Sequence, residues 1–235
     1  MCGRYSITIT PDMLYRLFGV EFRGNLEPRW NMAPTQAAPV IHLGHSGRSA
    51  TMMRWGLVPP WAKDTVGGAR MINARAETVA EKPAFRAAYR RRRCLVPADG
   101  FYEWKTEGGI KQPWRVERSD QAPFAFAGLW ELWEGHGEGS ALLTFTILTT
   151  EANAAIREIH HRMPVMLFDP QQFETWLAGD MRAVEALLRP SDPEAIKAYR
   201  VSPRVGNVRH DDASLIEPVA APPPNLREPQ QGSLF

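Results

Sequence analysis

The chain has 235 residues, of which 44% are hydrophobic and 23% charged, and its formal net charge is +2. These are values of a globular protein, and we expect one large core rather than two small ones. No apolar run approaches the roughly 18 residues of a membrane span, no signal-peptide pattern opens the chain, and two cysteines exclude a disulfide framework.

In chain order, the first predicted element is a strand over residues 4–10, which would hold Cys2 near the core. A helix over residues 11–18 follows, with Thr10 as its N-cap, and residues 27–39 are predicted to form a loop. The remaining predicted strands cover residues 39–43, 50–58, 94–97, 101–105, 114–117, 124–132, 141–149 and 163–168. The remaining predicted helices cover residues 82–93, 151–159, 170–178 and 181–188.

Strands outnumber helices in this pattern and do not alternate with them strictly. That order indicates an α+β protein rather than a doubly wound α/β fold. From about residue 220 the chain becomes Pro-rich and polar, which predicts a disordered tail over residues 220–235.

Cys2 is the most informative residue, because removal of Met1 would make it the N-terminus. The mature chain would then carry an α-amine that titrates near ~8 beside a thiol that titrates near ~8.5. An aldehyde condenses with such an amine to a Schiff base, and the thiolate closes a thiazolidine ring at high effective concentration. For an arbitrary protein the simpler interpretation is a cysteine that merely follows the start codon.

Three polar clusters interrupt the apolar strands, at residues 71–78, 99–105 and 159–164. Each has a structural interpretation when it is taken alone. Asn73 could cap a turn, and Glu103 could lie on the solvent face of a strand. His160 and His161 could lie at a helix C-terminus. Neither the histidines nor the cysteines have the spacing of a metal site, so we expect no metal and no other cofactor.

Together with the start Met-Cys-Gly-Arg, these clusters resemble the SOS response-associated peptidase family. That family includes bacterial abasic-site shielding proteins and a eukaryotic protein first described as a 5-hydroxymethylcytosine binder. The further matching stretches are Tyr5, Asn31-Met32-Ala33-Pro34, Trp55-Gly56-Leu57-Val58-Pro59 with Trp61, and Gly206-Asn207-Val208. The resemblance implies one domain over residues 2–219, with a mixed, strongly twisted, barrel-like β core flanked by short helices.

The resemblance also implies four catalytic residues. Cys2 is the nucleophile, and Asn73 positions the reacting end of the chain. Glu103 is the general acid/base beside the Cys2 amine, and His160 assists proton transfer around the sugar ring. The adjacent His161 departs from the Asp or Asn that we expect there, which leaves open which of the two imidazoles titrates.

The DNA contacts implied by the same resemblance come from three arginines and one tryptophan. Arg4, Arg75 and Arg162 are the candidates for binding backbone phosphates, to which the guanidinium fork is suited. Trp61 is a candidate surface for bases at a strand junction.

An abasic site is a deoxyribose in equilibrium between a closed hemiacetal and an open aldehyde, and opening it requires proton transfers. We therefore hypothesise a cytoplasmic, nucleoid-associated monomer that binds abasic sites in single-stranded DNA. It would cross-link to them through Cys2 and shield the lesion during replication, with lyase-like reversal as a further activity. Two alternatives stay open. One is a cysteine peptidase that uses Cys2 and His160 on itself or more widely. The other is a non-covalent reader of modified cytosine, which needs a base-flipping pocket and no free amine.

Two further features have no place in the catalytic hypothesis. The run Arg90–Arg93 is equally typical of a DNA contact and of a solvated helix end. The last residues, with Gln231, Leu234 and Phe235, resemble the peptide by which bacterial proteins dock on the replicative sliding clamp. Gly232 replaces the usual Leu of that peptide, and an accidental apolar end is the alternative interpretation.

Overall fold

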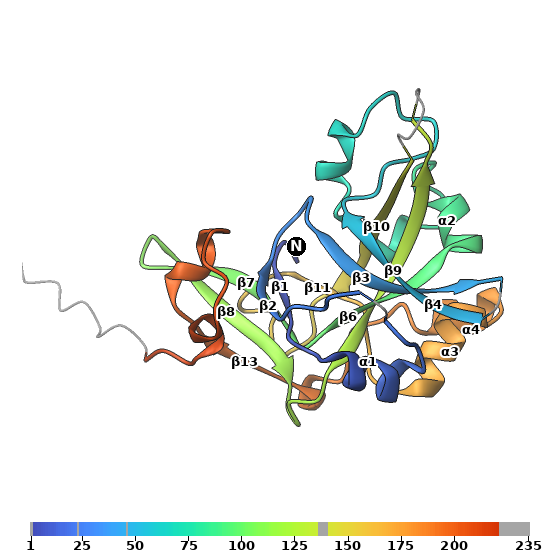
Figure 1. Cartoon of the computed structure of the whole chain (residues 1–235). Coiled ribbons are helices and arrows are strands. Elements are labelled where there is room, and N and C mark those ends of the chain that lie inside the picture. The colour runs from blue at the N-terminus through green and yellow to red at the C-terminus, as the bar shows by residue number, and fades with distance from the viewer. Residues whose placement is uncertain (1, 23, 46, 136–140, 221–235) are drawn as a thin grey trace, which may run out of the picture.

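The computed structural model describes residues 2–22, 24–45, 47–135 and 141–220, which form two sheets and short helices (Figure 1). The strands are β1 (Tyr5–Ile7), β2 (Arg29–Met32), β3 (Ala37–Gly44), β4 (Gly47–Trp55), β5 (Asn73–Arg75), β6 (Arg93–Ala98), β7 (Gly100–Glu107), β8 (Ile110–Arg118), β9 (Phe124–Trp133), β10 (Leu142–Glu151), β11 (Arg162–Pro164), β12 (Met166–Leu167) and β13 (Ile196–Arg200). The α-helices are α1 (Pro11–Phe18), α2 (Arg86–Arg91), α3 (Pro170–Ala178) and α4 (Met181–Ala186). The 3₁₀ helices are η1 (Val66–Arg70), η2 (Ala76–Thr78), η3 (Pro193–Ala195), η4 (Pro203–Gly206) and η5 (Ala213–Ile216). No helix in these described ranges is long and apolar enough to cross a membrane.

The smaller sheet has the strand order β13-β8-β7-β1-β2, and the larger has β11-β10-β4-β3-β6-β9-β12 with β5 beside β10. Because β9 also pairs with β10, five strands of the larger sheet close into a ring. Strand β10 pairs in parallel with β4 and β5 and antiparallel with β9 and β11. The predicted α+β class with a mixed, twisted β core is confirmed.

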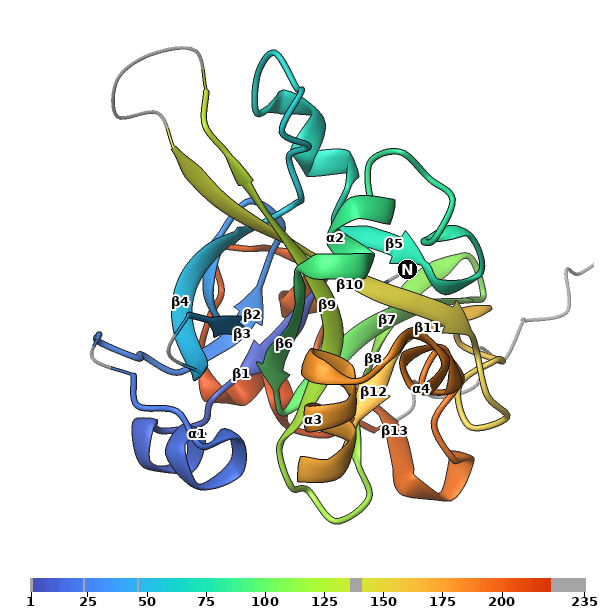
Figure 2. The same cartoon turned by 90° about the vertical axis from the view of Figure 1, so that its right-hand side faces the viewer.

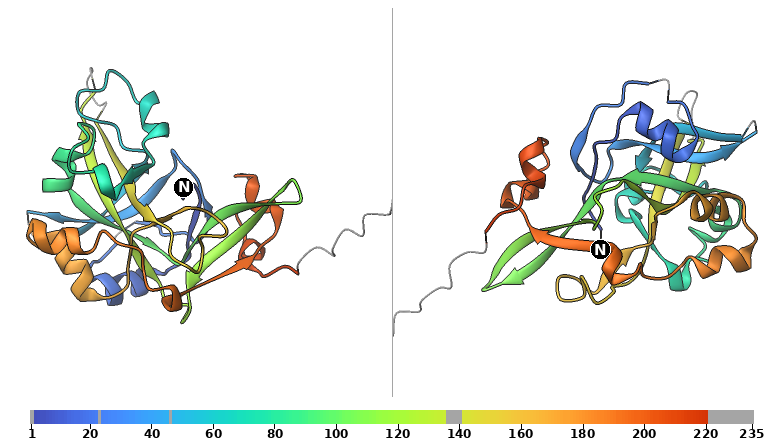
Figure 3. Two further views of the ribbon diagram at one scale, coloured as in Figure 1. Left: turned by 180° about the vertical axis from the view of Figure 1, so that it is seen from behind. Right: turned by 90° about the horizontal axis from the view of Figure 1, so that it is seen from below.

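The sheets meet along β1, the strand that follows Cys2, which Figure 1 shows between β7 and the larger sheet. Figure 3 shows the same arrangement from behind and from below, with β8 and β13 extending away from the ring. In the core, Trp55 of β4 stacks on Phe145 of β10 at a centroid distance of 6.3 Å, and Tyr5 of β1 meets Trp55 edge-on at 5.1 Å. Cys2 belongs to this core with no exposed surface, as the strand prediction expected.

Helices α1 and α3 have the bounds that the sequence predicts, because strong local signals set their ends. The hydroxyl of Thr10 accepts from the backbone N–H of Met13 at 3.2 Å, and Gly19 ends α1 with φ of 69°. Asp169 caps α3 in the same way, accepting from the N–H of Gln172 at 2.8 Å.

The helix predicted over residues 151–159 is wrong, since this segment forms successive turns. Glu151 of β10 pairs with Arg162 of β11, and the N–H of Ala152 donates to the carbonyl of His161 at 3.1 Å. Both ends of the connection are therefore held at one edge of the sheet, and no continuous helix fits between them.

The loop predicted over residues 27–39 contains β2, and strands β5 and β13 were not predicted. One side of β2 pairs with β1. On its other side, the carboxylate of Asp211 accepts from the N–H groups of Trp30 at 2.6 Å and Asn31 at 3.0 Å. A partner 180 residues away leaves no local signal in the sequence.

Candidate functional site

Cys2 lies at the junction of the two sheets, held by backbone contacts on both sides. Its thiol donates to the carbonyl of Arg4 at 3.8 Å, and that carbonyl also accepts from the N–H of Tyr102 at 3.0 Å. The amide of Asn73 donates to the carbonyl of Cys2 at 2.9 Å. Burial, reinforced by the negative charge of Glu103, raises the pKa of the Cys2 thiol far above its usual value. The thiol is therefore protonated and unreactive until a neighbouring base takes its proton.

Asn73 is held in place by the segment that follows β4. Its strand pairs in parallel with β10, with Asn73 opposite Ile147. The indole N–H of Trp55 donates to the carbonyl of Ile72 at 2.9 Å. Gly56, at a φ of 119°, is so close to Gly68 that an added Cβ would lie 2.5 Å from the Gly68 carbonyl oxygen. Trp55 and Gly56 therefore help to position the segment that leads into Asn73.

The Asn73 side chain has a free acceptor. Its carboxamide oxygen is buried, and the described residues provide it with no hydrogen-bond partner. A buried acceptor of this kind is suited to a hydrogen bond from an amine or hydroxyl group of a ligand.

Glu103 lies on β7 opposite Trp114, with only 3% of the residue exposed. The interpretation as the solvent face of a strand is therefore wrong. Burial raises the pKa of its carboxyl to about 7, because the ionised form has lost its hydration. A carboxyl that is half protonated near neutral pH can both donate and accept a proton, which is the requirement for general acid/base chemistry.

His160 completes the group, with its Nδ1 atom 4.0 Å from Oε1 of Glu103. The same Nδ1 atom lies 3.0 Å from the backbone nitrogen of Arg162 and 3.1 Å from its carbonyl oxygen, so the backbone of Arg162 orients the ring. Burial lowers the pKa of His160 and disfavours the imidazolium. The ring of the exposed His161 stacks on it with centroids 4.4 Å apart. Neither histidine lies at a helix C-terminus, because the preceding segment forms turns.

The three candidate phosphate-binding arginines differ in their surroundings. Arg75 follows Asn73 on β5 and is exposed. The Arg162 side chain is 9% exposed and forms a two-point ion pair with Glu77, with distances of 2.6 and 2.9 Å. Arg4 donates to the side-chain oxygen of Asn31 at 2.9 Å and to the carbonyl of Val205 at 2.7 Å. These contacts give Arg4 and Arg162 structural roles.

Asn31 links two stretches that lie far apart in the sequence. Its carboxamide donates to the carbonyls of Val205, Asn207 and His210 at 3.1, 3.1 and 2.8 Å. Arg4 binds the same loop through the carbonyl of Gly206 at 3.1 Å. The two stretches therefore fasten the strand that follows Cys2 to the C-terminal part of the described chain.

Two carboxylates that the sequence analysis left without a role also fix the site. Asp99 binds the Ser6 hydroxyl and the N–H of Thr8, and it pairs with the buried Arg115 at 2.9 Å. Glu77 binds Arg162 as described above. Both carboxylates lie within the polar clusters of the sequence. Apart from Arg115, their partners are 85 or more residues away along the chain, so no short-range pattern predicts these pairs.

The remaining candidates lie on loops or outside the described residues. Trp61 is 60% exposed on the loop after β4. Within the arginine run, Arg92 pairs with Glu131 at 2.6 Å, and Arg93 donates to the carbonyl of Gly179 at 3.0 Å just after α3, while Arg90 and Arg91 are exposed. The clamp-binding candidates Gln231, Leu234 and Phe235 lie outside the described residues.

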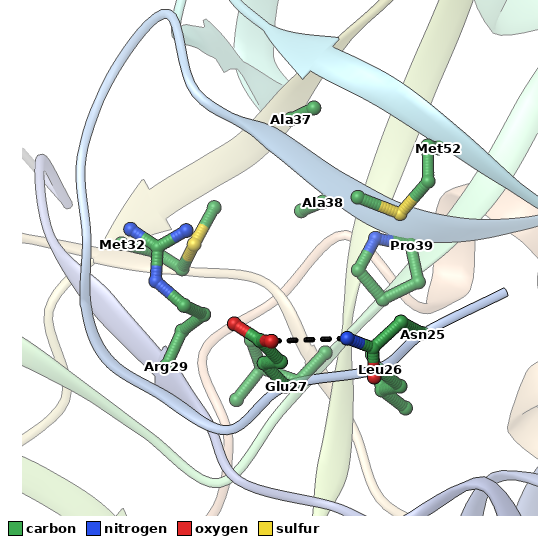
Figure 4. Close-up of a pocket in the computed structure, with 10 residues that line it drawn as sticks. Asn25, Leu26, Glu27, Arg29, Met32, Ala37, Ala38, Pro39 and Met52 are labelled. Carbon is green, nitrogen blue, oxygen red and sulfur yellow. Dashed lines mark hydrogen bonds between the residues drawn. The ribbon is translucent and has the colours of Figure 1, made fainter.

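A separate hollow of about 300 Å³ is lined by β1, β2, β3, β4 and the segment before β2 (Figure 4). Glu27 accepts from Asn25 at 2.9 Å within it, and Arg29 is paired with Asp211. None of the four catalytic candidates lines this hollow. In the described ranges, no group of three or more His, Cys, Asp or Glu residues is arranged to hold a metal ion.

This chain is similar to known proteins over most of its length. Residues 1–208 match the model of the family described as SOS response associated peptidase (SRAP). The abasic site processing protein YoaM of Bacillus subtilis is 41% identical over 224 residues, which cover 92% of this chain and 98% of the relative. The abasic site processing protein HMCES of Gallus gallus is 30% identical over 264 residues, covering 93% of this chain and 78% of the relative.

Solved structures share the fold. A crystal structure of a protein from Bacteroides thetaiotaomicron has a TM-score of 0.84 at 26% identity, over 93% of this chain and all of that chain. A protein from Bordetella bronchiseptica has a TM-score of 0.75 at 27% identity, over 86% of this chain and all of the other. The match over residues 1–208, the identity to the curated relatives and the shared fold together show that this chain belongs to the SOS response associated peptidase family.

Proposed function

We propose that this protein binds abasic sites in single-stranded DNA and forms a thiazolidine cross-link to them through Cys2, after removal of Met1. The observation that carries the proposal is the gathering of four groups from separate segments of the chain. The Asn73 amide lies 2.9 Å from the Cys2 carbonyl, and Glu103 lies 4.0 Å from His160. The names of the curated relatives, which are abasic site processing proteins, support the choice of substrate.

The reaction uses the α-amine of mature Cys2 first. The neutral amine adds to the C1′ aldehyde of the opened deoxyribose, and loss of water gives a Schiff base. The thiol then adds across the C=N bond, so that a C–S bond forms and the thiol proton is transferred to nitrogen. Glu103 is suited to accept the proton from the thiol and return it, since its pKa is about 7. His160, 4.0 Å from this carboxyl, is suited to relay a proton between Glu103 and the ring oxygen as the sugar opens, taking up one proton as it passes on another.

DNA contacts in this proposal rest on exposed groups. Arg75 is the exposed last residue of β5, two positions after Asn73, and it contacts a phosphate next to the lesion. Trp61 offers an exposed indole to an unstacked base. Arg4 and Arg162 stabilise the site from within. Each contacts a phosphate only if its guanidinium is shared between the phosphate and its present protein partners.

The test is denaturing-gel and intact-mass analysis of the processed protein mixed with single-stranded DNA that carries one abasic site. We expect a heat-stable adduct that Cys2→Ala and Cys2→Ser do not form. Protein that retains Met1 should also fail, because its α-amine is not on Cys2. A heat-stable adduct with Cys2→Ser would reject the thiazolidine, and no adduct from protein with a verified free Cys2 amine would reject the covalent function.

A cysteine peptidase is the second candidate, because Cys2, His160 and Glu103 lie together and the family is named for a peptidase. The complete burial of Cys2 favours cleavage of the chain's own N-terminal bond over cleavage of other proteins. Turnover of added peptides by the processed protein would support the wider activity. A reader of modified cytosine would bind DNA equally well with Met1 retained.

We also propose that the C-terminal residues recruit the protein to the replicative sliding clamp, with Leu234 and Phe235 as the apolar anchor and Gln231 as the polar one. Deletion of Leu234 and Phe235 should abolish clamp binding in a pull-down and leave adduct formation unchanged. Clamp binding that survives the deletion would contradict this role.

A further inference from the structure

A polar hollow of about 500 Å³ adjoins the catalytic group. It is lined by Arg75, Arg157, His161 and Arg162, together with Glu151 and Glu158. His161, whose ring stacks on that of His160 at 4.4 Å, and Arg75, which ends the strand that begins with Asn73, both line this hollow, so it lies next to the catalytic group. Arg157 lines it from the turns between β10 and β11.

A second and larger hollow, of about 760 Å³, begins at the same Arg157. Met166, Phe168 and Leu187 provide apolar surface within it, and Arg189 stands exposed at its edge. Figure 2 shows the turns after β10 next to the end of α4, on the side of the molecule where the chain starts. Arg157 lines both hollows, so they adjoin each other at this residue, and a strand that crosses Arg157 would follow a path from one hollow into the other.

The larger hollow has the properties that a nucleotide requires. A nucleotide presents an anionic phosphate and a flat apolar base, and single-strand binding proteins meet them with arginines and apolar or aromatic surface. Arg157 and Arg189 provide two exposed cations. Phe168 provides a half-buried aromatic ring, and the guanidinium of Arg118 lies over one of its faces at 5.0 Å from the ring centroid. Its volume lies within the range of about 300–1,000 Å³ typical of ligand sites.

The neighbouring polar side chains are engaged with the protein itself. Asn153 donates to the carbonyl of Ser191 at 2.9 Å, and Asp192 accepts from the N–H of Glu194 at 3.0 Å. The carboxylates of Glu151, Glu158 and Asp192 lie exposed along the path, and their charge offsets part of that of the arginines. We therefore expect phosphate contacts at the two arginines alone, because the carboxylates along the path prevent a broad cationic surface.

We infer that this larger hollow is a second subsite for the DNA strand, which binds a nucleotide several positions from the abasic site through Arg157 and Arg189. The inference rests on the proposed function and deepens it by adding a length requirement for the DNA. Arg157 contacts the phosphate nearer to the lesion, and Arg189 contacts the one beyond it. The protein thus grips one flank of the lesion over a longer distance than the catalytic group spans.

The test measures affinity for single-stranded oligonucleotides that carry a tetrahydrofuran analogue of the abasic site, which has no aldehyde and cannot cross-link. The strand is lengthened one nucleotide at a time on either side of the analogue. For the wild type, we expect affinity to rise over more added nucleotides on one side than on the other. Arg189→Ala should remove only the last part of that rise, and Arg157→Ala should end it earlier.

Salt dependence supplies a second readout. Loss of both arginines should flatten the slope of log affinity against log salt by about 1.4, since each single-strand phosphate contact contributes about 0.7. The matched control is Arg182→Ala, an exposed arginine of α4 that lines neither hollow. An unchanged length profile and slope in the double variant would overturn the second subsite. Failure of true abasic DNA to form an adduct would instead overturn the proposed function, so the two failures are distinct.

Discussion

Replacing Glu103 by Gln tests the chemistry of the site through protein stability. In the folded protein the pKa of this carboxyl is about 7, against an ordinary value of 4.5, because burial opposes its ionisation. Between pH 4.5 and 7 the folded state therefore retains a proton that the unfolded chain has lost. The free energy of unfolding of the wild type consequently falls as the pH rises through this window.

The expected size of the effect follows from the two pKa values. Their difference corresponds to about 3 kcal/mol once the carboxyl is ionised, since one pKa unit equals about 1.4 kcal/mol. Glutamine has nearly the same shape and does not titrate. Glu103→Gln should therefore gain up to about 3 kcal/mol over the wild type between pH 4.5 and pH 8.

The assay is urea denaturation of both proteins at pH 5, 6, 7 and 8, with Glu107→Gln as the matched control. Glu107 lies on the same strand and pairs with Arg200 at 2.9 Å near the surface, so its replacement should cost less than about 1 kcal/mol at each pH. At the same time, Glu103→Gln should slow adduct formation by about 100-fold or more, as expected for loss of a general acid/base. A stability difference that does not change with pH would refute the argument, because it would mean that the carboxyl ionises as freely as in water.

Three further predictions concern the residues around this carboxyl. Asn73→Ala removes the hydrogen bond to the Cys2 carbonyl, so single-turnover gels should show adduct formation slowed by about tenfold with DNA affinity unchanged. Glu77→Ala leaves the Arg162 guanidinium buried without its carboxylate, which should cost about 3 kcal/mol by urea denaturation, whereas Asp12→Ala, in an exposed pair, should cost less than about 0.5 kcal/mol. Gly56→Ala places a Cβ 2.5 Å from the Gly68 carbonyl oxygen at a φ of 119°, so we expect the free energy of unfolding to fall by more than about 2 kcal/mol and adduct formation to slow. Wild-type values of both would contradict the positioning of Asn73 by this contact.

The elements that the sequence predicted well are those whose ends are set by neighbouring residues. Helix α1 has its cap at Thr10 and its left-handed end at Gly19, and both signals lie within ten residues. The turns at residues 151–159 contain helix-forming residues such as Ala154 and Ala155, but the pairing of β10 with β11 fixes their ends. Tertiary pairing overrides local propensity there.

The site residues were identified by a family resemblance, and their arrangement was not predictable from local pattern. Glu103 and His160 are 57 positions apart and meet only because β7 and the end of the β10–β11 connection come together. The roles of the arginines show the same limit. The sequence marks Arg4, Arg75 and Arg162 alike as candidates for phosphate, yet Arg75 alone of the three is exposed. Burial and ion pairing, which distinguish them, depend on residues far away in the chain.

The burial of Cys2 bears directly on the order of the chemical steps in the cross-linking reaction that we propose. A thiol whose pKa is raised stays protonated near neutral pH, so it neither competes with the amine for the aldehyde nor oxidises readily. Once the Schiff base has formed, its nitrogen becomes the acceptor for the thiol proton, and Glu103 can carry that proton because its pKa lies near 7. The same burial that silences the thiol in the free protein also raises the pKa of Glu103, so one apolar environment adjusts both groups for a reaction in which the amine acts first.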